Sequence, residues 1–129
     1  MGFLDNFRKA QNTNLAEGWE ILENEKQLAA AIKESFDKPV MLFKDSVSCG
    51  ISARAKQGLL SDWDVSADEL SFYYLDLLSH RNISNKIAAD LKVIHQSPQI
   101  ILVKNGKAVF DISHHRISVS EVKRALQSV

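Results

Sequence analysis

A short apolar run followed by a polar turn and a lone cysteine most constrains the fold of this chain. Val40–Phe43 is continuously apolar, which predicts a strand buried on both faces. Cys49 follows in a Ser-rich turn, and apolar residues at Ala55, Leu59 and Trp63 predict a helix that begins immediately after it. Free N–H groups and the dipole at such a helix start stabilise a thiolate. The polar turn favours this role over that of a small buried hydrophobe.

The other expected elements alternate between strand and helix. We expect strands at 19–22, 40–43, 72–75, 99–103 and 107–112. The first helix is expected from Asn24 to the break at Pro39, and the second directly after Cys49. The third is expected at 83–91, with Asn82 or Ser84 near its start, and the last from Ser118 or Ser120. Gly58 weakens the expectation of an unbroken second helix. Asn105-Gly106 between two apolar runs predicts a hairpin. This order predicts an α/β domain over 17–129, with parallel βαβ units, a C-terminal antiparallel hairpin and helices on both faces of a mixed sheet. Residues 1–16 are expected to form an N-terminal segment with a short helix.

Composition limits the classes of partner. The 129 residues suit one domain, and 16 basic residues balance 16 acidic ones, so no general field attracts nucleic acid or an anionic membrane. No apolar run reaches membrane-spanning length, and a single cysteine fits a reducing compartment. His114 and His115 are adjacent and have no companion ligand at metal-binding spacing, so we expect no metal site. We therefore expect a cytoplasmic monomer without nucleic-acid or membrane partners.

The element order, with a cysteine after the second strand and a proline before the fourth, resembles the thioredoxin fold over residues 19–129. The stretch from Ser97 to Lys107 looks like the part of that fold in which a cis-proline faces the active cysteine. The resemblance implies a cis Ser97–Pro98 bond in contact with the Cys49 turn, where neighbouring backbone groups orient a substrate strand.

A narrower resemblance is carried by several short motifs: Phe43-Lys44-Asp45-Ser46, Ser48-Cys49-Gly50-Ile51-Ser52, Tyr74-Leu75-Asp76-Leu77, His80-Arg81 and His95-Gln96-Ser97-Pro98-Gln99. Together they look like the YtxJ-like bacilliredoxins, monothiol proteins associated with the small thiol bacillithiol. Gly50 stands where that family commonly has proline. The Cys49–Ser52 turn is also similar to the Cys-Gly-Phe-Ser turn of monothiol glutaredoxins, which hold iron–sulfur clusters with glutathione, although their longer proline-containing approach loop is absent.

The cysteine count predicts the chemistry. Ser52 occupies the place of the second cysteine of a dithiol thioredoxin and cannot form a disulfide. Cys49 is expected to take a low-molecular-weight thiol from a protein mixed disulfide, and a second small thiol then regenerates it. The small thiol is a co-substrate and no other cofactor is expected. The alternatives are an iron–sulfur cluster carrier and a non-enzymatic interaction domain.

Residues around Cys49 have more than one interpretation. Ser48, Gly50, Ile51 and Ser52 form the expected active-site turn, in which Ser52 either hydrogen-bonds the thiolate or is an ordinary first-turn serine. Lys44 either supplies positive potential for an acidic small thiol or is a solvated residue at a strand end. Ser97 and Pro98 are expected to bind substrate. Arg81 either contacts a carboxylate of the small thiol or serves in helix capping and surface pairing. His95 either approaches the rim of the active site or is a surface histidine. Helix N–H groups predict a Cys49 pKa modestly below the usual thiol value of about 8.5.

Overall fold

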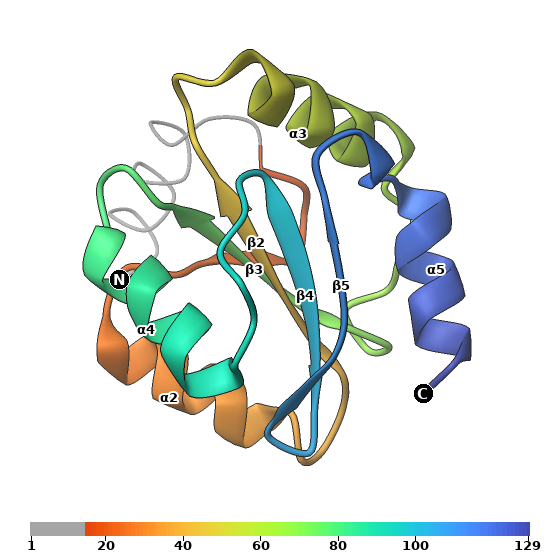
Figure 1. Ribbon diagram of the computed structural model, residues 1–129. Coiled ribbons are helices and arrows are strands. Elements are labelled where there is room, and N and C mark those ends of the chain that lie inside the picture. Colours follow the sequence, from red (N-terminus) through yellow and green to blue (C-terminus); the bar gives the residue numbers. More distant parts are fainter. Residues whose placement is uncertain (1–14) are drawn as a thin grey trace, which may run out of the picture.

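Five strands form the central sheet in the computed structural model, which describes residues 15–129 (Figure 1). The strands are β1 (Trp19–Ile21), β2 (Val40–Asp45), β3 (Ser71–Asp76), β4 (Gln99–Lys104) and β5 (Lys107–Ser113). The helices are α2 (Glu25–Glu34), α3 (Gly50–Asp62), α4 (Arg81–Leu91), the 3₁₀ turn η1 (His114–Arg116) and α5 (Val119–Gln127). The predicted helix within residues 1–16 lies largely outside the described residues.

The strand order β1-β3-β2-β4-β5 combines parallel and antiparallel pairing. β1, β3 and β2 run parallel, whereas β4 is antiparallel to both β2 and β5. The β4–β5 connection has Asn105 at φ 53° and Gly106 at φ 78°. Two successive residues with positive φ are what a type I′ hairpin turn requires, so the hairpin predicted from Asn-Gly is confirmed.

Helices cover both faces of the sheet, as predicted. On one face, α3 and α5 pack over Met41 and Phe43. On the other face, α2 and α4 pack over Val40 and Leu42. These four neighbours alternate along β2 and are all fully buried, which explains why the run contains no polar residue.

Local signals at the helix ends were mostly informative. Asn24 forms a capping box with Gln27, and Ser118 caps α5 by accepting a hydrogen bond from Glu121 N–H. α2 ends at Glu34, well before Pro39, and α3 runs unbroken through Gly58. α4 begins at Arg81, so Asn82 lies in its first turn and the N-cap is His80, whose side chain makes no capping bond. Within residues 15–129, no helix has the length and apolar character needed to span a bilayer.

Candidate active site

Cys49 is the N-cap residue of α3. Its backbone is extended (φ −103°, ψ 127°), and its side chain makes no capping hydrogen bond. Its N–H donates to the Ser46 carbonyl at 2.9 Å, and its carbonyl accepts from Ala53 N–H at 3.0 Å. These bonds fix the turn between β2 and α3 and leave the half-buried thiol available at the helix start.

The backbone of the first α3 turn favours the charged form of Cys49. The N–H groups of Ser52 and then Ile51 lower the pKa of the Cys49 thiol below its ordinary value, against the opposing effects of desolvation and of the negative charge of Asp45. The direction is the one predicted from the strand-to-helix junction. A thiolate at this position is a nucleophile.

Ser52 combines the two roles that the sequence left open. Its side chain is fully buried, and its Oγ accepts a hydrogen bond from Ser46 N–H at 3.2 Å. The Ser52 hydroxyl also contributes to the lowered pKa of Cys49. Ser52 therefore closes the turn and supports the thiolate at the same time.

A buried carboxyl group lies close to this turn. Asp45 is the last residue of β2, is 2% exposed, and accepts a hydrogen bond from the Tyr74 hydroxyl. Its Oδ1 atom has no hydrogen-bond partner. Burial raises the pKa of the Asp45 carboxyl, although the Tyr74 bond and the positive charge of Lys56 oppose the shift. No sequence pattern assigned Asp45 a role, although its position just after an apolar run was the available signal.

Lys44 is buried beside it, and its interpretation as a solvated residue is wrong. β2 continues two residues past Phe43, and Lys44 pairs with Leu75 and Gln99 inside the sheet. The side chain is 0% exposed, and Nζ has no hydrogen-bond partner. Burial lowers the pKa of the Lys44 ammonium to about 8. Because Nζ is inaccessible, Lys44 does not present an open contact to a ligand.

The substrate-side segment meets the same end of the sheet. The Ser97–Pro98 peptide bond is cis, the isomer that the fold resemblance implies. Gln99 pairs with Lys44, so Pro98 lies one step beyond it, level with the end of β2. The Pro98 carbonyl accepts a hydrogen bond from His114 N–H at 3.0 Å, whereas Ser97 Oγ is buried without a partner.

His95 and Arg81 lie on the α4 side of this end. Desolvation and then the charges of Lys44 and Arg81 lower the pKa of the His95 imidazole. Its Nδ1 is 3.5 Å from the hydroxyl of Ser84 in α4. The structure thus brings Lys44, Arg81 and His95 together, but on the opposite face of the sheet from α3.

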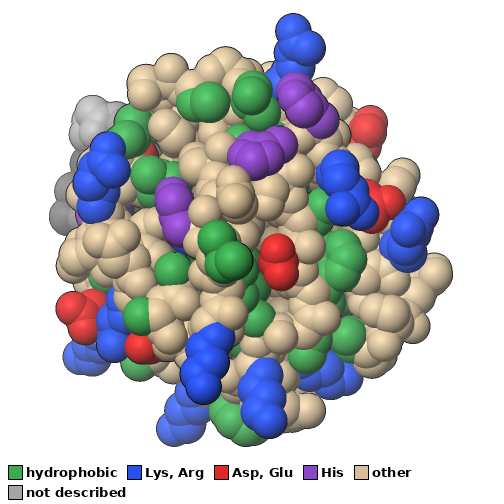
Figure 2. All heavy atoms as spheres, viewed as in Figure 1, with side chains coloured by type: hydrophobic (Ala, Val, Ile, Leu, Met, Phe, Trp, Pro, Cys, Tyr) green, Lys and Arg blue, Asp and Glu red, His purple; other side chains and the backbone are tan. Residues whose placement is uncertain are grey.

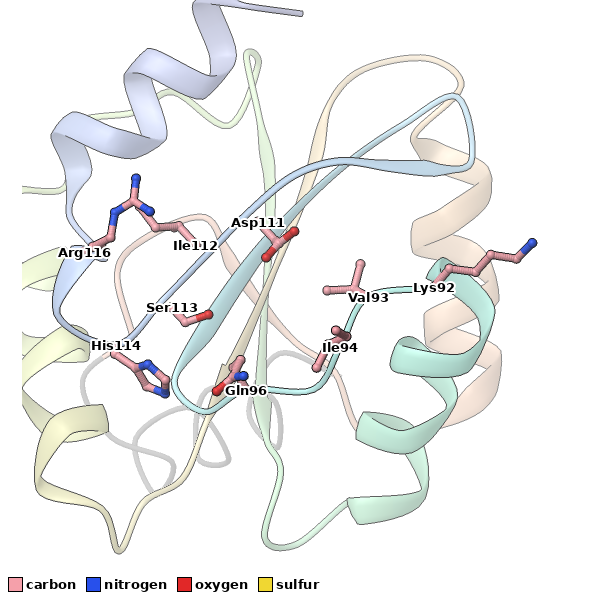
Figure 3. A pocket seen from close by; sticks show the side chains of 9 residues that line it. All are labelled: Lys92, Val93, Ile94, Gln96, Asp111, Ile112, Ser113, His114 and Arg116. Carbon is pink, nitrogen blue, oxygen red and sulfur yellow. The ribbon is translucent and has the colours of Figure 1, made fainter.

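Two hollows flank η1. A small cavity of about 130 Å³ is lined by Ile51, Arg54, Ala55, His114, His115 and Ile117. A larger groove of about 590 Å³ lies between the segment 92–96 and β5, where Val93 and Ile94 face Asp111 and Ser113 (Figure 3). His114 borders both and has φ 58°, an uncommon conformation for a residue other than glycine. Figure 2 shows histidine side chains in the upper half of this face of the molecule.

No group of three His, Cys, Asp or Glu side chains within residues 15–129 is arranged to hold a metal ion. The predicted position of His114 and His115 in a loop is close to the observed one, because both belong to the short turn η1. Neither histidine was predicted to lie beside α3, since more than 50 residues separate the two segments in the sequence.

Comparisons with known proteins agree on both fold and family. Residues 20–122 match the family model described as "Monothiol bacilliredoxin BrxC". A solved structure described as a candidate oxidoreductase with a thioredoxin fold is 31% identical, with a TM-score of 0.69, over 84% of this chain and 93% of that one. A Malassezia sympodialis thioredoxin is 16% identical with a TM-score of 0.68 over 90% and 93% of the two chains. Mitochondrial thioredoxin 3 from Saccharomyces cerevisiae is 14% identical with a TM-score of 0.66 over 85% and 94%. The last two show the fold alone, a thioredoxin-like fold as predicted.

Proposed function

Because the chain belongs to the monothiol bacilliredoxin family, we propose that Cys49 removes a low-molecular-weight thiol, bacillithiol or a similar compound, from mixed disulfides on proteins. The observation that carries this proposal is the position of the chain's single cysteine at the α3 N-cap, where backbone N–H groups lower its pKa. A thiol oxidoreductase role is supported by the family and the fold together. The small thiol is the co-substrate, so the reaction as written needs no bound cofactor.

The proposed reaction has two exchange steps. The Cys49 thiolate attacks the small-thiol sulfur of the mixed disulfide, a new disulfide joins Cys49 to the small thiol, and the client sulfur leaves as a thiolate that takes a proton from water. A second small thiol, as its thiolate, then attacks the small-thiol sulfur of the adduct. This step releases the small-thiol disulfide and regenerates Cys49. Ser52 cannot replace the second thiol, because a hydroxyl forms no disulfide.

The turn and the cis-proline segment have separate proposed roles. Ser48, Gly50 and Ile51 shape the turn, while Ser97 and Pro98 orient the client strand. A Cβ atom on Gly50 meets nothing within 4 Å, so there is open space for a side-chain carbon at this position, where the family commonly has proline. Proline is also favoured at the first position of a helix. We therefore expect Gly50→Pro to be compatible with the start of α3.

A single-turnover experiment tests the function. The reduced protein is mixed with a client that carries one small-thiol mixed disulfide, and both are followed by intact mass after acid trapping. We expect one small-thiol adduct on Cys49 for each client thiol released, after which turnover stops until free small thiol is added. In Ser52→Cys, the introduced thiol is expected to displace the small thiol from Cys49 as an internal disulfide forms, so this release no longer needs added thiol, while the next turnover needs a reductant for that disulfide. Release of client thiol without any adduct on Cys49 would rule out the monothiol route.

A further inference from the structure

A small cavity lies between α3 and η1, and Cys49 is not among the residues that line it. Ile51, Arg54 and Ala55 line it from the first turns of the helix that Cys49 caps. A helix rises 1.5 Å per residue, so these three residues lie roughly 3 to 9 Å along the axis from Cys49. A small thiol joined to Cys49 through its sulfur must extend over a distance of this order to reach the cavity.

The second wall of the cavity is tied to the substrate-side segment. His114, His115 and Ile117 belong to or follow η1, and the His114 N–H bond to Pro98 O holds this wall against the cis-proline turn. His114 keeps a left-handed backbone conformation in this position, which is costly for a residue with a side chain. The cavity therefore lies between two elements that are both fixed relative to Cys49.

The polar side chains that line the cavity are all basic residues. Arg54, His114 and His115 contribute nitrogen groups, Ile51, Ala55 and Ile117 are apolar, and the lining contains no carboxylate. Among residues 15–129, no acidic side chain forms an ion pair with Arg54, His114 or His115. A guanidinium is always charged and pairs well with a carboxylate.

From this arrangement we propose that the cavity is a subsite for an anionic group, most simply a carboxylate, of the small thiol attached to Cys49. The inference rests on the proposed function and specifies which small thiols the site at Cys49 accepts. About 130 Å³ holds a carboxylate with its adjoining carbons, since liquid water occupies about 30 Å³ per molecule. A peptide segment of the client needs more room than this.

The test uses three thiols of similar size that differ in charge: 3-mercaptopropionate, 2-mercaptoethanol and 2-aminoethanethiol. Each symmetrical disulfide is equilibrated with the reduced protein at low ionic strength, and intact mass gives the exchange constant for the Cys49 adduct. For Arg54→Gln relative to the unmodified protein, we expect the constant for 3-mercaptopropionate to fall roughly threefold to tenfold, that for 2-mercaptoethanol to stay unchanged, and that for 2-aminoethanethiol to rise. Comparing each thiol with itself cancels differences in intrinsic thiol chemistry.

Arg116→Gln is the matched control, because Arg116 is also an exposed arginine of this region but lines the larger groove and not the cavity. It should leave all three constants within about twofold of the unmodified protein, as expected for an exposed charge without a close partner. Arg54→Lys should recover part of the preference, since it keeps the charge but loses the planar fork.

Three outcomes are decisive. Loss of the carboxylate preference in Arg54→Gln alone supports the subsite. Equal constants for Arg54→Gln and the unmodified protein, or equal losses in Arg54→Gln and Arg116→Gln, overturn it while leaving Cys49 as the nucleophile. Failure of Cys49 to form an adduct with any of the three thiols removes the proposed function and this inference with it.

Discussion

At the end of β2, two adjacent charged residues face opposite sides of the sheet and differ in their hydrogen-bond partners. On the α3 face, Asp45 has the Tyr74 hydroxyl as a donor and Lys56 as a nearby cation. On the α4 face, Lys44 is fully buried without a hydrogen-bond partner. Both burials cost free energy, since an ion loses its hydration. Only on the α3 face does the buried charge influence Cys49.

The reactive groups therefore lie on one face of the sheet, and a buried charge that does not act on them lies on the other. The α3 face holds the nucleophile, Ser52 and Asp45, which are linked by hydrogen bonds or charge. The charge on the α4 face acts on His95 instead. Variants on the α3 face should therefore change reactivity, whether or not stability changes too, whereas substitution of Lys44 on the α4 face should change stability alone.

The largest expected effect is that of Cys49→Ser. A serine hydroxyl supplies almost no anion near neutral pH and cannot form the disulfide intermediate, so small-thiol transfer should be abolished. Release of client thiol measured with a thiol reagent checks this, and circular dichroism should show an unchanged fold. If Cys49→Ser retained transfer, Cys49 would not be the nucleophile, and the assignment of reactivity to the α3 face would be wrong.

Lys44→Met should have the next largest effect, on stability. A pKa lowered from 10.5 to about 8 corresponds to at most about 3 kcal/mol, and partial hydration of the ammonium reduces this, so we expect the variant to be about 1 to 3 kcal/mol more stable at pH 7. Between pH 8 and about 10, the unfolded chain binds the proton that folded Lys44 has released, so the stability of the unmodified protein should rise with pH. Lys44→Met should lack this rise.

Urea unfolding at pH 7, 8 and 9 measures both effects. Lys104→Met is the control, because Lys104 ends β4 at the opposite end of the sheet and is only partly buried. Its unfolding free energy should keep the pH dependence of the unmodified protein. A destabilised Lys44→Met, with the slope retained, would show that the ammonium has a favourable partner in solution.

The sequence was informative wherever one local pattern determined one element. Alternation of apolar runs gave the order of strands and helices, and Asn105-Gly106 gave the hairpin because its turn requires two positive φ angles. The position of Cys49 at a helix start, and the direction of its pKa shift, also followed from local spacing. These features depend on neighbours in sequence.

Features that depend on pairing across the sheet were not predictable in this way. Lys44 looked solvated because a charge after an apolar run normally ends a strand, but pairing with β3 and β4 carries β2 two residues further. The cavity was missed for the same reason. Arg54 and His114 lie 60 positions apart, and only the packing of η1 against α3 brings them together.

Ser52→Ala should slow attack by Cys49 by no more than about tenfold, the effect of losing a hydrogen bond worth roughly 1 to 1.5 kcal/mol. The substitution also leaves Ser46 N–H without the acceptor recorded at 3.2 Å, so a small loss of stability should accompany it. Stopped-flow reaction with a small disulfide measures the rate. Ser120→Ala, which changes an exposed serine in the first turn of α5, should leave the rate unchanged.

A larger loss would place Ser52 in a more demanding role. If Ser52→Ala reduced the attack rate a hundredfold with no change in the Cys49 pKa, the hydroxyl would be acting on the transition state and not on the ground-state thiolate. The pH dependence of alkylation separates the two cases, because support of the thiolate moves the midpoint whereas transition-state support does not.

Asp45→Asn should have the smallest effect on reactivity, in the opposite direction. The negative charge of Asp45 raises the pKa of Cys49, so its removal should lower that pKa further and increase alkylation below the midpoint by about twofold.

Burial raises the pKa of Asp45 itself, so the folded state binds its proton more tightly than the unfolded state does. Asp45 therefore makes stability fall as pH rises from the unfolded carboxyl pKa through the folded one, and Asp45→Asn should remove that decline. Asp111→Asn, an exposed change on β5, should alter neither alkylation nor this pH dependence. Slower alkylation in Asp45→Asn than in Asp111→Asn would show that the carboxyl assists Cys49, for example by holding Ser52 in place, and would reverse the sign assigned to this face of the sheet.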